Sequence, residues 1–80
     1  MIKKELYPTD GRKSFYGKAY TITSDNGDEV LYSYNTAIIK KAKSGELFKL
    51  WNGWTATTGR HIKAFCEMNK AKFLKLKAEG

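Results

Sequence analysis

The first half of the chain alternates between apolar and polar positions with a period of two, which is typical of β-strands. Residues 15–23, "FYGKAYTIT", are rich in aromatic and β-branched residues and predict one strand. Its larger side chains share one face: Tyr16, Lys18, Tyr20 and Ile22. Residues 29–34, "EVLYSY", predict the returning strand, with Val30, Tyr32 and Tyr34 on one face. Asn26-Gly27 between them predicts a two-residue type I′ hairpin, because both residues tolerate the positive φ that this turn requires.

Two more strand patterns follow between residues 36 and 51. Residues 36–42, "TAIIKKA", predict a third strand or a continuation past a bend at Asn35. A turn around Gly45 separates them from "LFKLW", residues 47–51, which predicts a fourth strand. Gly53 in "NGW" is the expected bend after it.

From Thr57 or Thr58 the period changes to three and four residues, which predicts an amphipathic helix. Its apolar stripe contains Ile62, Phe65, Cys66, Phe73 and Leu76, and Asn69 interrupts it. The pattern therefore predicts a single α+β domain over residues 1–80: a small antiparallel β-meander of about four strands at 15–54, packed against one C-terminal helix at 57–79. Residues 1–13, which contain the turn "YPTDGR", are expected to be a loosely ordered arm.

Composition limits how such a domain can be stabilised, and it bears on whether the chain is secreted or spans a membrane. Eighty residues bury a small core, and the single cysteine, Cys66, excludes an internal disulfide. The eleven aromatic residues are the expected core material. The start "MIKKELYP" lacks the apolar run of a signal peptide, and no segment approaches the ~20 apolar residues of a membrane span. We expect a soluble intracellular protein.

The net charge of +7 is confined to the second half of the chain. Residues 1–39 are balanced, whereas residues 40–80 hold ten lysines and arginines against Glu46, Glu67 and Glu79. Such a bias predicts a basic face that attracts phosphates or acidic partners, or lysines that only keep a small domain soluble. The candidate phosphate contacts are Lys40, Lys41, Lys43, Lys49, Lys63, Lys70, Lys72, Lys75 and Lys77.

The segment "WNGWTATTGRHIKAF", residues 51–65, concentrates candidate chemistry at the predicted helix start. A helix N-terminus favours anions, so Thr58, Arg60 and His61 form a candidate anion site. Gly59 would leave that turn open to close approach. Trp51 and Trp54 could stack bases there. The alternative assigns these residues to structure: the threonines (Thr55, Thr57 or Thr58) as helix caps, the tryptophans as core, and His61 as a hydrogen-bonded structural residue.

Catalysis is not expected. One histidine and one cysteine cannot complete a metal site, and His61 and Cys66 would lie about 140° apart around a helix. The glycines do not form a phosphate-cradling loop, and Asp25, Asp28 and Glu29 at the predicted hairpin tip suit solvated carboxylates. We therefore expect a non-enzymatic protein with no metal and no cofactor.

Two segments together, "LYSYNT" (31–36) and residues 51–65, resemble a family of short proteins from bacteriophages and mobile elements of Gram-positive bacteria. That family combines a Tyr-Ser-Tyr-x-Thr strand with a Ser-x-Thr-Thr-x-Arg-His helix start. The matching residues are Tyr32, Ser33, Tyr34, Thr36, Trp51, Thr57, Thr58, Arg60, His61, Ile62 and Phe65. Trp54 and Thr55 stand where the family has Tyr and Ser. The resemblance covers roughly residues 15–69. It implies a phage-like origin, with the cytoplasm of a bacterial host as the expected location, and no particular activity.

Two functions follow as expectations. The first is a binding module that engages nucleic acid, or a nucleic-acid-bound complex, through the lysine- and arginine-rich face. The second is a protein-directed inhibitor of a host enzyme or defence complex, such as an anti-CRISPR protein. A small phosphorylated ligand at Thr58, Arg60 and His61 is a third possibility. The tail "KFLKLK" suits a membrane-surface or partner helix, a frayed end, or a homodimer contact through Phe73, Leu74 and Leu76.

Overall fold

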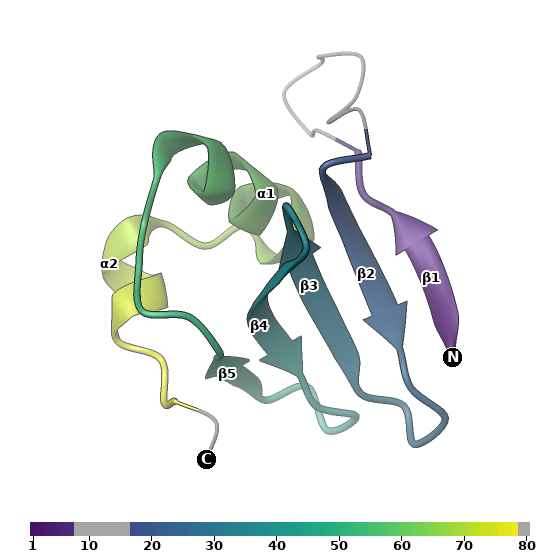
Figure 1. Ribbon diagram of the computed structural model, residues 1–80. Helices are drawn as coiled ribbons and strands as arrows, with labels where there is room; N and C mark the ends of the chain where they lie inside the picture. The colour runs from purple at the N-terminus through teal and green to yellow at the C-terminus, as the bar shows by residue number, and fades with distance from the viewer. Residues whose placement is uncertain (8–16, 79–80) are drawn as a thin grey trace.

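A five-stranded antiparallel sheet with two short helices forms the fold, as seen in a computed structural model that describes residues 1–7 and 17–78. The strands are adjacent in chain order from β1 at one edge to β5 at the other (Figure 1). The predicted α+β class and antiparallel meander are confirmed, with five strands where about four were expected. The elements are β1 Ile2–Glu5, β2 Ala19–Thr23, β3 Glu29–Ser33, β4 Thr36–Lys41, β5 Leu47–Lys49, α1 Ala56–Cys66 and α2 Lys70–Leu74.

The additional strand is β1, which lies within the segment expected to be a loose arm. It pairs with β2 from Ile2 opposite Thr23 to Glu5 opposite Tyr20. The Leu6 amide extends the pairing by donating to the Ala19 carbonyl at 3.0 Å. All four β1 residues are exposed, so no apolar alternation marks this edge strand in the sequence. The rest of the arm, residues 8–13, and the predicted start of the second strand at 15–16 lie outside the described residues.

Five residues separate β2 from β3, and a hydrogen bond between Ser24 and Asp28 closes a three-residue loop over 25–27, so the predicted two-residue turn at Asn26-Gly27 is wrong. The Gly27 amide donates to the Ser24 carbonyl at 3.0 Å, and the Ser24 amide donates to the Asp28 carbonyl at 2.8 Å. Only Gly27 takes a positive φ, +94°. The β4–β5 loop repeats this arrangement from Ala42 to Glu46, with Gly45 at φ +96°. In both loops one glycine supplies the left-handed residue that follows the turn.

Tyr34-Asn35 forms the two-residue hairpin instead. Ser33 pairs with Thr36 across it, and the two turn residues have φ +52° and +68°. Positive φ at both positions defines a type I′ turn. The predicted bend at Asn35 is therefore a complete hairpin turn, and Tyr34 holds a backbone conformation that costs energy for a bulky side chain.

Asp28 ties the two three-residue loops together. Its Oδ1 accepts from the Lys43 amide at 3.0 Å, and its Oδ2 lies 3.4 Å from Lys40 Nζ. The hydrogen bond from Lys43 and, after it, the charge of Lys40 hold the pKa of this carboxyl below its ordinary value. Asp28 is thus a structural group, in contrast to the solvated carboxylates predicted for this hairpin tip.

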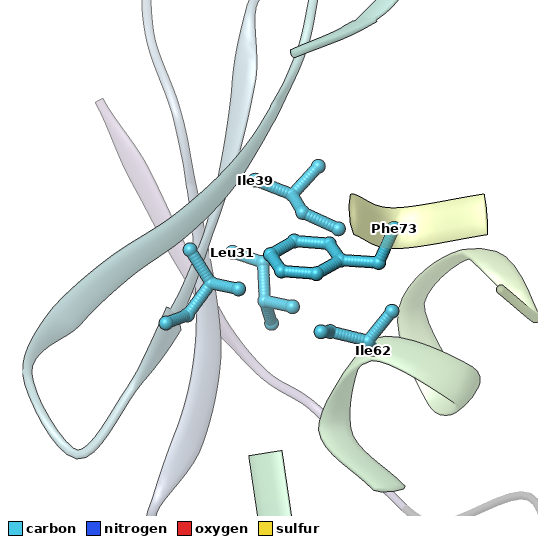
Figure 2. Close-up of a cluster of buried hydrophobic side chains, with 5 residues drawn as sticks. Leu31, Ile39, Ile62 and Phe73 are labelled. Atoms are coloured by element: carbon cyan, nitrogen blue, oxygen red, sulfur yellow. The ribbon is translucent and has the colours of Figure 1, made fainter. Parts of the chain in front are cut away.

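Both helices pack on the face of the sheet that carries Leu31 and Ile39. The buried cluster joins this face to Ile62 of α1 and Phe73 of α2, with Leu31, Ile39, Ile62 and Phe73 converging on one another in Figure 2. On β2 the small residues Ala19 and Thr21 face the helices. The larger residues that the sequence analysis placed together, among them Tyr20 and Tyr32, lie on the opposite face and stack with centroids 5.2 Å apart. Among the described phenylalanines, tyrosines and tryptophans only Phe73 is fully buried, while Trp51, Trp54 and Phe65 pack partly buried against the core.

A bulge in β4 allows one more apolar side chain of this strand to be buried. Leu31 pairs with Ile39 and Tyr32 pairs with Ala37, which leaves Ile38 as an extra residue on β4. A bulge interrupts the alternation of side chains between faces. Ile38 and Ile39 are therefore both buried although they are consecutive.

The predicted single helix at 57–79 is divided into two. α1 ends at Cys66, where Glu67 adopts φ +56°, and Asn69 then caps α2 by accepting from the Lys72 amide at 2.9 Å. The break turns α2 back onto the core, where Phe73 is buried. The chain after α2 then reaches β5, with the Lys49 amide donating to the Lys77 carbonyl at 2.7 Å (Figure 1).

Neither helix within 1–7 and 17–78 has the length and apolar character needed to cross a bilayer.

Phe73 and Leu74 provide a test of this packing because they are adjacent but differ in burial. Phe73 is 0% exposed and Leu74 is 41% exposed. Phe73→Ala should lower the free energy of unfolding by about 3–5 kcal/mol, since it opens a cavity under both helices. Leu74→Ala should change it by less than about 0.5 kcal/mol. Urea unfolding followed by tryptophan fluorescence measures both; equal losses would mean that α2 is not docked in this way.

Candidate functional site

Thr55 begins α1. Its backbone is extended, at φ −130°, and its Oγ1 accepts from the Thr58 amide at 3.0 Å. The first intrahelical bond runs from the Gly59 amide to the Thr55 carbonyl at 2.8 Å. Among the three candidate caps, Thr55 is therefore the N-cap, which leaves Thr57 exposed and Thr58 directed into the protein.

Beneath this helix start, three buried polar side chains connect β3 to α1. Ser33 Oγ lies 2.7 Å from His61 Nδ1 and 3.4 Å from Thr58 Oγ1. Thr58 and His61 are three residues apart and so occupy one face of the helix. Their exposed fractions are 6% and 1%, and that of Ser33 is 3%. We call Ser33, Thr58 and His61 the β3–α1 junction.

The environment of His61 favours its neutral form. Burial lowers the pKa of the ring from its ordinary value, and the positive charge of Arg60 lowers it further. Burial and hydrogen bonding give His61 and Thr58 a structural role, as in the second interpretation of the sequence, and Thr58 also contributes to the lining of a pocket. Arg60 lies beside them and is half-buried.

Ser33 was not among the predicted site residues. The signal available was its position two residues after Leu31, which places both on the same face of β3. A serine on a buried apolar face needs a hydrogen-bond partner. That partner lies 28 positions away in the chain.

Gly59 accommodates a tryptophan and not a ligand. A Cβ at this position would lie 2.5 Å from Cζ2 of Trp54, well inside van der Waals contact. The Trp54 ring in turn lies 5.8 Å from the ring of Phe73, between centroids. The close approach predicted at Gly59 therefore exists, but it serves the packing of α1 against the core. Trp54 belongs to that packing and is not a free stacking surface.

Trp51 also packs partly buried against the core, and in addition it lines a pocket beside the start of α1. The pocket has a volume of about 450 Å³ and is broadly open to solvent. Hydroxyl and aromatic groups dominate its lining, which consists of Ser33, Tyr34, Thr36, Trp51, Thr55, Thr57 and Thr58. A stacking role for Trp51 was predicted from the sequence, but the contribution of Tyr34 to the same pocket was not.

Two of the predicted phosphate-contacting lysines have structural partners. Lys40 Nζ pairs with Asp28, and Lys49 Nζ donates to the Leu74 carbonyl at 3.2 Å. The other seven are exposed: Lys41, Lys43, Lys63, Lys70, Lys72, Lys75 and Lys77. They belong to the ends of β4 and α1, to the β4–β5 loop, to α2 and to the chain after it. We call this group the lysine surface.

The carboxylates of the described chain do not neutralise the lysine surface. Within residues 1–7 and 17–78, no carboxylate lies within ion-pair distance of these seven ammonium groups. The charge of Lys41 acts on Cys66, where it opposes the larger effect of burial, which raises the pKa of the thiol.

The proposed dimer contact through Phe73, Leu74 and Leu76 does not exist as an exposed patch. Phe73 is fully buried, and Leu76 packs partly buried against the same core. Only Leu74 faces solvent to a large extent. The turn of α2 onto the sheet, which the sequence pattern did not reveal, is the reason.

No metal cluster is formed by the part of the chain that the structure describes: three or more histidine, cysteine, aspartate or glutamate side chains do not come together there. Cys66 Sγ donates to the Ile62 carbonyl at 3.6 Å and so takes part in the hydrogen bonding of its own helix.

The model of a protein family described as a family of unknown function (DUF8033) matches residues 2–78. Neither a curated protein nor a solved structure matches the chain. The family match covers the sheet, both helices and the β3–α1 junction.

Gly59 and Trp54 allow the helix packing to be tested by a double-mutant cycle. Gly59→Ala should destabilise the protein by about 1–3 kcal/mol, because the new Cβ would overlap the Trp54 ring. In a Trp54→Leu background the same change should become neutral or stabilising by up to about 1 kcal/mol, since alanine favours helix. Thermal and urea unfolding of the four proteins measure the cycle. An equal penalty in both backgrounds would contradict the contact.

Proposed function

The chain belongs to this family of unknown function, and we propose that it is a non-enzymatic protein that binds nucleic acid through the lysine surface. The single observation that carries the proposal is the set of exposed ammonium groups that no described carboxylate neutralises. A polyanion that contacts such groups releases counterions, which drives binding.

Four of these lysines follow from the way α2 is built. Within eight residues the chain carries Lys70, Lys72, Lys75 and Lys77, and the helix directs Phe73 inward between them. Because Phe73 anchors the segment to the core, its lysines are held on a folded surface instead of on a free tail. A fixed array of this kind supports binding to a phosphate backbone with little ordering of the chain.

Two lysines of the predicted phosphate-binding set, Lys40 and Lys49, have partners within the protein, which leaves fewer lysines available to contact phosphates. Asp28 accepts from Lys40, and the end of α2 accepts from Lys49, so both side chains stabilise the fold. Thr58 and His61 are withdrawn into the junction. We therefore propose the lysine surface, flanked by half-buried Arg60, as the phosphate-binding region.

A protein-directed inhibitor of a host enzyme or defence complex is the second candidate, and the sheet provides the observation that favours it. Both helices occupy the Leu31 face, so neither helix covers the face that carries Tyr20, Ile22, Val30, Tyr32 and Phe48. Apolar and aromatic side chains on such a face suit a protein partner. A pull-down from nuclease-treated host lysate separates the two candidates, because a stoichiometric protein partner survives nuclease only in the second.

The nucleic-acid proposal is tested by removing two positive charges either from α2 or from the edge strand β1. Lys70→Gln with Lys72→Gln should weaken binding to an oligonucleotide and reduce the slope of log K against log salt by about two. Lys3→Gln with Lys4→Gln removes the same charge from β1, at the far edge, and should have a much smaller effect. Fluorescence anisotropy with labelled single- and double-stranded oligonucleotides, from low to physiological salt, measures both.

Equal losses in the two double variants would mean that only net charge matters and would contradict a defined lysine surface. Absence of binding by the unmodified protein to every oligonucleotide at low salt would remove the proposed function altogether.

A further inference from the structure

We propose that the pocket beside the start of α1 holds one unstacked base of a single-stranded nucleic acid, with the Tyr34 ring as its stacking surface. This inference rests on the proposed function and adds to it a site and a substrate class. The lysine surface would attract any strand. The pocket would select a strand whose bases are free to leave the stack.

The lining of the pocket fits a planar, polar-edged ring. Tyr34 and Trp51 contribute aromatic surface, and Thr36, Thr55 and Thr57 contribute hydroxyl groups. A volume of about 450 Å³ lies within the range of small-molecule sites. Aromatic side chains stack on any base, while hydroxyls both donate and accept at base edges, so this lining suits binding with little sequence preference.

The ring of Tyr34 is held in place while remaining accessible. Its residue is 54% exposed, and its ring lies 5.8 Å from the ring of His61, between centroids. Lys18, the residue before β2, places its Nζ over the same ring, 5.7 Å from the centroid. The buried junction therefore contacts the tyrosine through His61, and Lys18 provides a cation at the ring for the phosphate of a bound nucleotide.

The fold itself does not explain a tyrosine at this position. Residue 34 is the first central residue of a type I′ turn, with φ +52°, where asparagine, aspartate or glycine is preferred. Its side chain is too exposed to contribute much to the core. A role for the ring in binding supplies a reason for a residue that the turn disfavours.

Single strands fit this site better than duplexes. The bases of a duplex stack on one another, whereas loops and single strands can place a base against an aromatic side chain. Removing such a stacking side chain typically weakens binding by about 5-fold or more.

The test uses Tyr34→Asn, which removes the ring while giving the turn a residue that it prefers. The variant should unfold at an equal or higher temperature than the unmodified protein, yet bind a labelled single-stranded oligonucleotide about 5-fold or more weakly. Tyr34→Phe keeps the ring and should bind nearly as well as the unmodified protein. Tyr7→Asn, at another exposed tyrosine outside the pocket, is the matched control and should leave affinity unchanged.

Each outcome has a defined meaning. If Tyr34→Asn binds as tightly as the unmodified protein while the double lysine variant on α2 is weakened, the pocket assignment is overturned and the proposed function stands. If the unmodified protein binds no oligonucleotide, both are overturned. If nucleoside monophosphates bind as tightly as oligonucleotides, the pocket takes a free nucleotide, and the assignment to a strand is overturned.

Discussion

The hydrogen bond between Ser33 and His61 fixes the position of α1 on the sheet, and much of the structure depends on that position. Both groups are buried, so loss of either one would remove a hydrogen bond that water does not readily replace for the other. With α1 held against β3, Ile62 reaches the cluster around Leu31, and Gly59 meets the Trp54 ring. The same contact brings Ser33 and Thr58 to the floor of the pocket.

This constraint gives different roles to residues that the sequence predicted as one binding region. The conspicuous helix start, with Thr58 and His61, is turned inward and holds the fold. We propose that binding uses other groups. These are Tyr34, whose ring lies against His61, and the exposed lysines of the lysine surface. The two proposed contact regions differ in kind, because the lysine surface attracts phosphates and the pocket accepts a ring.

Local patterns predicted the strands and the class of the fold because period-two alternation survives wherever one face of a sheet is buried. They did not reveal which face was buried. The helices cover the face that carries Leu31 and Ile39, on which Ala19 and Thr21 are also buried, so Tyr20 and Tyr32 lie on the other side. Residue preference also misplaced the two-residue turn: glycine at 27 serves a three-residue loop, and Tyr34 occupies the type I′ turn against its preference. Asn69 was recognised as an interruption, but the turn of α2 onto the core depends on Phe73 finding Leu31 and Ile39.

The candidate site was predictable to a similar extent. The charge asymmetry of the chain identified the basic half, since composition alone determines it. Which lysines remain exposed depends on Asp28 and on the carbonyl at the end of α2, partners that only the folded chain brings close. The role of His61 likewise depends on a serine 28 residues earlier. No local motif contains that pair, although a polar residue on the buried face of β3 pointed to a missing partner.

The central claim, that His61 is a buried structural group, is tested most directly by an NMR titration of its ring, which is unambiguous because the chain contains one histidine. Burial and the charge of Arg60 lower its pKa in the folded protein, so the folded state favours the neutral ring. Its contribution to stability is complete above the unfolded pKa of about 6.5 and is lost as the pH falls through the lower folded value. The account predicts that the ring titrates in the folded protein with a midpoint below 6.5. A ring that titrates near 6.5 while the protein remains folded would contradict it.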